Sequence, residues 1–132
     1  MSNKNIYRCY RQQNVLCLRA AISNQKEQPI IIRLLIDTGA SYTVIPIPIL
    51  KRINYDVENP IKRKKIITAN GAIDVPIIVV PAFNCMGIKQ KEFSVVGLNL
   101  PVNSFTDGLL GMDFLREAKA VIDIAKAEIR LN

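Results

Sequence analysis

The residues best suited to chemistry are one aspartate and the small polar residues after it, Asp37-Thr38-Gly39-Ala40-Ser41. The apolar run Leu34-Leu35-Ile36 precedes them and predicts a buried strand that ends at a carboxylate. A buried carboxylate is costly unless hydrogen bonds or a function compensate for it. Gly39 permits close backbone approach, and Thr38 and Ser41 supply hydroxyls that can support the acid. We interpret the segment as a strand that delivers one acid to a catalytic loop.

Two other interpretations of this segment need to be weighed. An Asp-x-Gly turn can bind phosphate in ATPases of the actin and sugar-kinase type, and a solvated Asp-Gly turn at a strand end needs no function. The chain has 132 residues, which is one domain and too short for a two-lobed ATPase. The choice between a catalytic loop and a plain turn depends on the rest of the chain.

The composition predicts a folded, β-rich domain, with 49% hydrophobic residues and many Ile and Val. No apolar run is long enough to span a membrane, and residues 1–13 lack the apolar core of a signal peptide. Cys9, Cys17 and Cys85 lack metal-ligand spacing and the chain has no histidine, so we expect no metal, no cofactor and no Ser-His or Cys-His catalysis. Free cysteines without a secretion signal favour a cytoplasmic location.

The net charge of +7 includes the basic run Lys62-Arg63-Lys64-Lys65. Such a charge permits attraction to nucleic acid, an anionic membrane or an acidic protein. Aromatic residues do not interleave with this run, so a platform for stacking bases is not supported. We interpret the run as solvated positions beside a strand and regard nucleic acid as an unlikely main partner.

The order of polar and apolar segments predicts a loosely held arm at residues 1–13 and a single domain at 14–132. A short helical turn is expected within 47–53, and a helical pattern is expected after Gly111, through Ala118. The segment 30–36 is almost continuously apolar, as expected for a strand buried on both faces. The expected strands are 15–23, 30–36, 42–46, 61–68, 72–80, 89–96, 120–124 and 128–131.

Two further landmarks follow the aspartate loop. Ala69-Asn70-Gly71 lies between β-branched runs and predicts a tight hairpin, which by itself is a plain surface feature. Gly108-Leu109-Leu110-Gly111 combines bulky apolar residues with a glycine that lets the chain pass tightly beneath another segment. Asp113 follows at the start of the expected helix, where an acid usually serves as a cap or dipole partner, and Asp123 has no following Thr-Gly; we expect both to be structural.

Asp37-Thr38-Gly39-Ala40, preceded by Leu-Leu-Ile, resembles the active-site loop of aspartic proteases. The order and separation of this loop, the Asn70-Gly71 hairpin and Leu109-Leu110-Gly111 resemble the retropepsins, the retroviral-type, single-domain branch, over residues 15–131. The chain is too short for the two lobes of a pepsin-like protein. The resemblance implies a mainly all-β fold, a closed β-barrel of short strands with a flap hairpin and one short C-terminal helix.

The resemblance also implies a mechanism in which two carboxylates share a proton around one water molecule. Only one Asp-Thr-Gly is present, so the active enzyme is expected to be a homodimer in which each chain contributes Asp37. Thr38 would cross to the partner loop and rigidify the pair. The expected substrate-binding residues are Gly39, Ala40 and Ser41 of the loop and Ala69, Asn70 and Gly71 of the flap. Leu109, Leu110 and Gly111 would brace the loop from behind.

Two positions depart from the retroviral pattern. Many retroviral members pair an acid after Asp-Thr-Gly-Ala with an arginine after the later glycine, whereas this chain has Ser41 and Met112 there. The dimer must therefore be held by other contacts, to which the arm 1–13 is a candidate contributor. The start at Met1 without a flanking polyprotein leads us to expect a stand-alone bacterial or host-encoded relative.

The function expected from these observations is a homodimeric aspartic endopeptidase that cleaves extended polypeptides. The alternative is a protease-like module for dimerisation or peptide binding that has little or no catalytic turnover.

Overall fold

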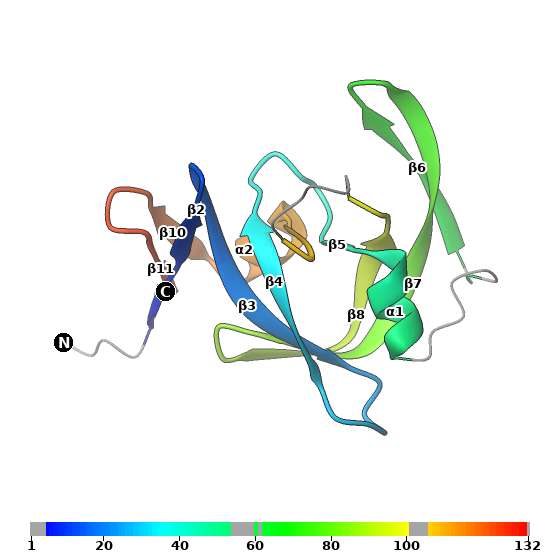
Figure 1. The fold of residues 1–132 in the computed structure, drawn as a ribbon, viewed down its shortest axis with the longest axis horizontal. Helices are drawn as coiled ribbons and strands as arrows, with labels where there is room; N and C mark the ends of the chain where they lie inside the picture. The colour runs from blue at the N-terminus through cyan, green and yellow to red at the C-terminus, as the bar shows by residue number, and fades with distance from the viewer. Residues whose placement is uncertain (1–4, 54–59, 61, 101–105, 132) are drawn as a thin grey trace.

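The computed structural model describes residues 5–53, 60, 62–100 and 106–131. Two sheets and two short helices make up this part of the chain (Figure 1). The helices are α1 (Ile47–Arg52) and α2 (Met112–Glu117). Within the described ranges, no helix is both long and apolar enough to cross a membrane.

The larger sheet has the strand order β2-β3-β4-β9-β5-β8-β7-β6, and β3 also pairs with β7. This additional pairing closes β3, β4, β9, β5, β8 and β7 into a barrel, which confirms the predicted closed β-barrel. The strands are β2 (Tyr10–Gln12), β3 (Val15–Ser23), β4 (Ile30–Ile36), β5 (Val44–Ile45), β6 (Lys62–Thr68), β7 (Gly71–Cys85), β8 (Ile88–Gly97) and β9 (Gly108–Leu110).

The barrel interior is filled by alternate residues of the strands together with α2. Three aromatic rings meet there: Phe83 stacks on Phe93 with ring centroids 4.7 Å apart, and Phe114 of α2 packs edge-on against Phe83 at 5.5 Å. Edge-to-face and offset pairs of this kind add to the stability gained from burial alone. Helix α2 is therefore fixed to the barrel by its buried face.

Strand β4 is buried on one face only over its first half, which differs from the expectation that both faces would be buried. Ile32 and Leu34 point into the core, whereas Ile31 is 62% exposed and Arg33 lies at the surface. Successive side chains of a strand point to opposite faces, and only one face of this strand meets the barrel interior here.

Strand β7 continues through two prolines and ends at Cys85, beyond the expected end at residue 80. The pairing with β8 skips one position: Val80 lies opposite Phe93 and Ala82 opposite Lys91. Glu92, at this skipped position, has a φ of +52°, and the register is the same on both sides of it, so the ladder is interrupted without an inserted residue. Pro81 lies opposite Glu92 at this interruption, where its missing N–H costs no regular ladder bond, so the strand need not stop.

Residues 5–13 are more ordered than the loose arm that the sequence predicted, and residues 1–4 of that arm lie outside the described residues. Three short strands, β1 (Ile6–Arg8), β11 (Glu128–Leu131) and β10 (Ala120–Asp123), form an antiparallel sheet in the order β1-β11-β10. Cys9 N–H donates to the carbonyl of Ala127 at 2.8 Å, and β2 joins the barrel beside β3. Backbone pairing holds these strands, and three-residue strands are too short to produce a hydrophobic period.

Candidate active site

Asp37 lies directly after β4, at the end of a parallel strand pair. Strand β4 pairs with β9, so that Leu35 faces Leu109 and Ile36 faces Leu110. The pairing continues one residue further, because Asp37 N–H donates to the carbonyl of Leu110 at 3.0 Å. The backbone of Asp37 is thus anchored to the strand behind it, while its side chain is only partly buried.

The residues after Asp37 fold into a tight turn around its carboxylate. Gly39 N–H donates to Asp37 Oδ1 at 2.9 Å, and Ala40 N–H donates to the Asp37 carbonyl at 3.1 Å. A Cβ at Gly39 would lie 3.3 Å from Asp37 Oδ1, which leaves little space for a side chain. The turn orients the acid, and Thr38, Gly39 and Ser41 are exposed around it.

The chain crosses behind this turn at Gly111. Met112 N–H donates to the carbonyl of Ala40 at 2.8 Å, and Asp113 N–H donates to the carbonyl of Ser41 at 3.3 Å. A Cβ at Gly111 would lie 2.6 Å from the carbonyl carbon and oxygen of Tyr42, closer than real contacts allow. Glycine is therefore required by close backbone approach, and the crossing segment supports the aspartate loop from behind.

Thr43 and Asp113 form a second support that the sequence did not reveal. Asp113 Oδ1 accepts from Thr43 Oγ1 at 2.8 Å and Oδ2 accepts from Thr43 N–H at 2.9 Å. Thr43 Oγ1 in turn accepts from Gly111 N–H at 3.2 Å. Asp113 does lie in the first turn of α2, as expected, and also accepts from Phe114 N–H. Thr43 is fully buried, and a buried hydroxyl needs a hydrogen-bond partner. A threonine within an apolar run was therefore the sequence signal for this contact.

Thr43→Val is expected to lower the free energy of unfolding by about 1–3 kcal/mol, because Gly111 N–H would lose its acceptor in a buried place. Urea unfolding followed by circular dichroism measures this loss. Ser94→Ala, at an exposed position of β8, is the control, and its free energy of unfolding is expected to change by no more than about 0.5 kcal/mol. Equal stability of the Thr43 variant and the wild type would contradict the assigned role.

The predicted hairpin is present, but its tip lies away from the aspartate loop. Strands β6 and β7 pair from Lys62 opposite Ile77 up to the turn at Ala69 and Asn70, and they project from the barrel (Figure 1). Gly71 has a φ of +110° and open space around its Cα, which suits a glycine at a tight turn. The structure thus brings Asp37, Gly39 and Gly111 together and leaves the tip apart from them.

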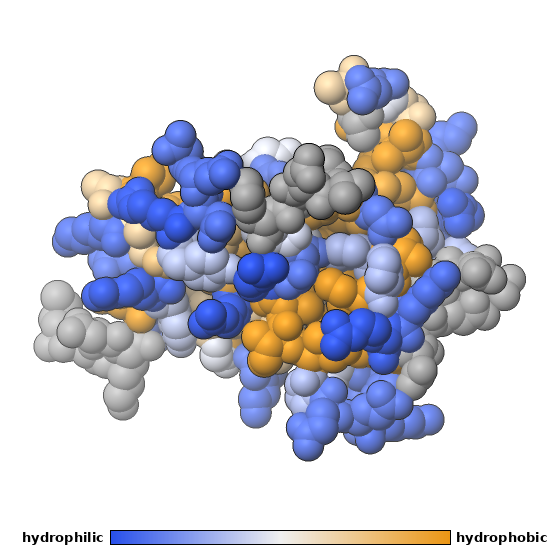
Figure 2. All heavy atoms as spheres, viewed as in Figure 1, coloured by the Kyte–Doolittle hydropathy of each residue, from blue (hydrophilic) through white to orange (hydrophobic). Residues whose placement is uncertain are grey.

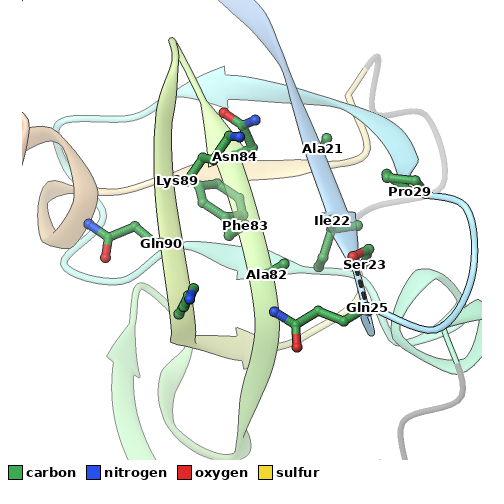
Figure 3. Close-up of a pocket in the computed structure, with 11 residues that line it drawn as sticks. Ala21, Ile22, Ser23, Gln25, Pro29, Ala82, Phe83, Asn84, Lys89 and Gln90 are labelled. Atoms are coloured by element: carbon green, nitrogen blue, oxygen red, sulfur yellow. Dashed lines mark hydrogen bonds between the residues drawn. The ribbon is translucent and has the colours of Figure 1, made fainter.

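Two hollows differ in their relation to the loop. One, of about 250 Å³, begins at Thr38 and is bordered by Met112, Leu115 and Ile122. The other, of about 240 Å³, lies between β3, β7 and β8, with Ile22 and Phe83 in its wall (Figure 3). None of the residues that line this second hollow belongs to the predicted site. Only the first hollow adjoins the aspartate loop.

Comparison with known proteins defines the class of this chain. A retropepsin-like aspartic protease from Rickettsia conorii has a similar structure, with a TM-score of 0.72 and 23% sequence identity over 96% of this chain and 89% of that chain. The fold is therefore retropepsin-like. The family of gag-polyprotein putative aspartyl proteases matches residues 23–117, and the chain belongs to this family. No curated protein matches the sequence.

Proposed function

We propose that this protein is a homodimeric aspartic endopeptidase that hydrolyses peptide bonds in extended polypeptides. The observation that carries the proposal is the position of Asp37, which ends a strand and is held by Gly39 N–H and by the carbonyl of Leu110. Membership of an aspartyl protease family supports the same reaction. Each chain offers one such acid, so the reaction requires a second copy.

In the proposed mechanism, the two Asp37 carboxyl groups share one proton at the dimer axis. The ionised carboxylate takes a proton from a bound water molecule as the water oxygen attacks the peptide carbonyl carbon. The other carboxyl group donates its proton to the carbonyl oxygen, which gives a tetrahedral diol. Its collapse breaks the C–N bond as a proton passes to the leaving amine, and a carboxyl group and an amine are released.

The other predicted residues have roles that follow from this mechanism. Backbone groups of Gly39, Ala40 and Ser41 would pair with an extended substrate in the manner of an added strand. The hairpin tip at Ala69, Asn70 and Gly71 would close over the bound peptide as a flap, with Gly71 supplying the freedom to bend. We further assign residues 14–132 to a single protease domain preceded by the segment 1–13.

The surface that would meet the second copy is the hollow beside Thr38. Met112 stands where many retroviral members have an arginine, is 40% exposed and borders this hollow with Leu115 and Ile122. Apolar contacts there would replace the ion pair that Ser41 and Met112 cannot form. Burial of such side chains is the main favourable term in most associations.

Met112→Asp is expected to give a folded monomer with little or no cleavage activity, because like charges placed against each other in the dimer cost several kcal/mol. Sedimentation and peptide turnover measure the two effects. Ile31→Asp places the same charge at a 62% exposed position on β4 and should leave the dimer and its activity unchanged. A monomeric Met112 variant with full activity would refute the shared active site.

We also propose a cytoplasmic location, because the cysteines are not joined in disulfides. Cys9, Cys17 and Cys85 are all free and buried. Burial raises the pKa of the Cys85 thiol to about 12, so it stays protonated and unreactive at neutral pH. Free thiols are typical of proteins from reducing compartments.

A further inference from the structure

The consecutive basic residues of β6 are divided between the two faces of the hairpin. Lys64 lies opposite Val75, which is 2% exposed and packs with Val44 against the barrel, so these two side chains share the inner face. Arg63 points to the outer face, where its Nε lies 3.0 Å from Asp74 Oδ2. Figure 2 shows the same division, with hydrophobic residues on the side of the hairpin toward the barrel and hydrophilic residues on the outer side. Lys64 is therefore a cation on a mainly apolar face.

The side chain of Lys64 reaches the aspartate loop. Its ammonium donates a hydrogen bond to the hydroxyl of Tyr42 and lies 4.3 Å from the centre of the Tyr42 ring. Tyr42 follows Ser41 in the loop, and its carbonyl lies against Gly111. This contact joins the hairpin to the loop and places a positive charge between them.

Lys64 and Tyr42 together retain unused hydrogen-bond donors. The tyrosine oxygen accepts from the ammonium, so its own O–H remains available, and the ammonium has further N–H groups. Among the described residues, the structure gives the Lys64 ammonium no carboxylate partner. A carboxylate accepts from both kinds of donor and forms stronger, charge-assisted bonds with the cation.

We propose that Lys64 and Tyr42 form a subsite for an acidic side chain of the substrate, so that the enzyme selects peptides with a Glu or Asp close to the cleaved bond. This inference rests on the proposed function. An extended peptide between the loop and the hairpin directs alternate side chains toward opposite sides, and one of them meets this pair. The net charge of +7 attracts acidic segments in general, whereas this pair selects one position.

Fluorescent decapeptides that differ only by Glu or Gln at one position test the proposal. When the varied residue is the one that meets Lys64 and Tyr42, the wild type is expected to cleave the Glu peptide with a kcat/KM about tenfold higher than that for the Gln peptide. Lys64→Met should remove this ratio by slowing cleavage of the Glu peptide alone, and Lys64→Glu should favour a Lys peptide instead. Lys65→Met is the matched control, because Lys65 points to the outer face beside Asp74, and it should keep the tenfold ratio.

A structural role for Lys64 would lower cleavage of both peptides equally, and that result would overturn the proposal, as would a ratio that survives Lys64→Met. Binding of the same peptides to the Asp37→Asn protein, measured by fluorescence anisotropy, separates this inference from the proposed function. If no peptide is cleaved by the wild type, the proposed function fails. Preferred binding of the Glu peptide that is lost in the Lys64→Met background still supports the subsite, and equal binding overturns it.

Discussion

Asp37→Asn is expected to abolish peptide cleavage and to leave the barrel folded. The amide cannot take a proton from water, and loss of a general acid–base group typically costs about 10²–10⁴-fold in rate. The amide oxygen can still accept from Gly39 N–H, so the turn should keep its shape. Turnover of a peptide library, read by mass spectrometry from about pH 4 to 7 to cover the titration range of carboxyl groups, measures the loss.

Glu27→Gln is the matched control for this experiment. It removes one carboxylate from the turn before β4, at the end of the strand opposite to Asp37, and should keep full activity. Undiminished cleavage by the Asp37 variant would remove this residue from the mechanism. Peptides that bind to the wild type but stay intact would favour the alternative, a peptide-binding module.

Mixing the wild type with the Asp37→Asn protein tests whether the active site is shared between two chains. If each dimer needs two Asp37 residues, an equal mixture that exchanges subunits should retain about one quarter of the wild-type activity, because only that share of dimers carries both acids. Independent active sites would leave about one half. The mixture therefore distinguishes a joint site from two separate ones without any change of fold.

Gly111→Val is expected to give the second large loss of activity. The new Cβ would lie 2.6 Å from the Tyr42 carbonyl, while the 2.8 Å hydrogen bond between Met112 and Ala40 resists separation of the two segments. We expect about 1–3 kcal/mol of lost stability from the strain. Displacement of Asp37 by even about 1 Å can reduce the rate about 10²-fold.

Ile22→Val separates the two effects of the Gly111 substitution. Ile22 is fully buried at the end of β3 that pairs with the start of β4, and its truncation should cost about 0.5–1.5 kcal/mol. A similar loss of stability without a loss of turnover in this control would assign the Gly111 effect to loop geometry. Full activity of Gly111→Val would show that the crossing does not position the acid.

Features encoded by neighbouring residues were predictable from the sequence. The apolar run before Asp37, the turn at Asn70-Gly71 and the glycine after Leu110 each depend on a few consecutive residues. The closed barrel was an implication of the retropepsin resemblance that these segments carry, and the structure confirms it. The helix after Gly111 followed from the same local pattern.

Contacts between distant segments were not predictable in the same way. Thr43 and Asp113 are 70 residues apart, and Lys64 meets Tyr42 across 22 residues. Neither contact produces a periodic pattern, because each needs only one side chain from each segment. The three-residue strands near the N-terminus are held by backbone pairing, which side-chain patterns do not report.

The sequence by itself predicted Asp37 as the candidate catalytic acid and determined that each chain has one Asp-Thr-Gly. It did so because a carboxylate between a buried strand and a glycine turn is a local and costly arrangement. Only the tertiary structure decided what supports that acid and which face of the hairpin carries a charge toward it. Those features depend on strand register and on how closely backbones pass, and both are fixed when the barrel closes.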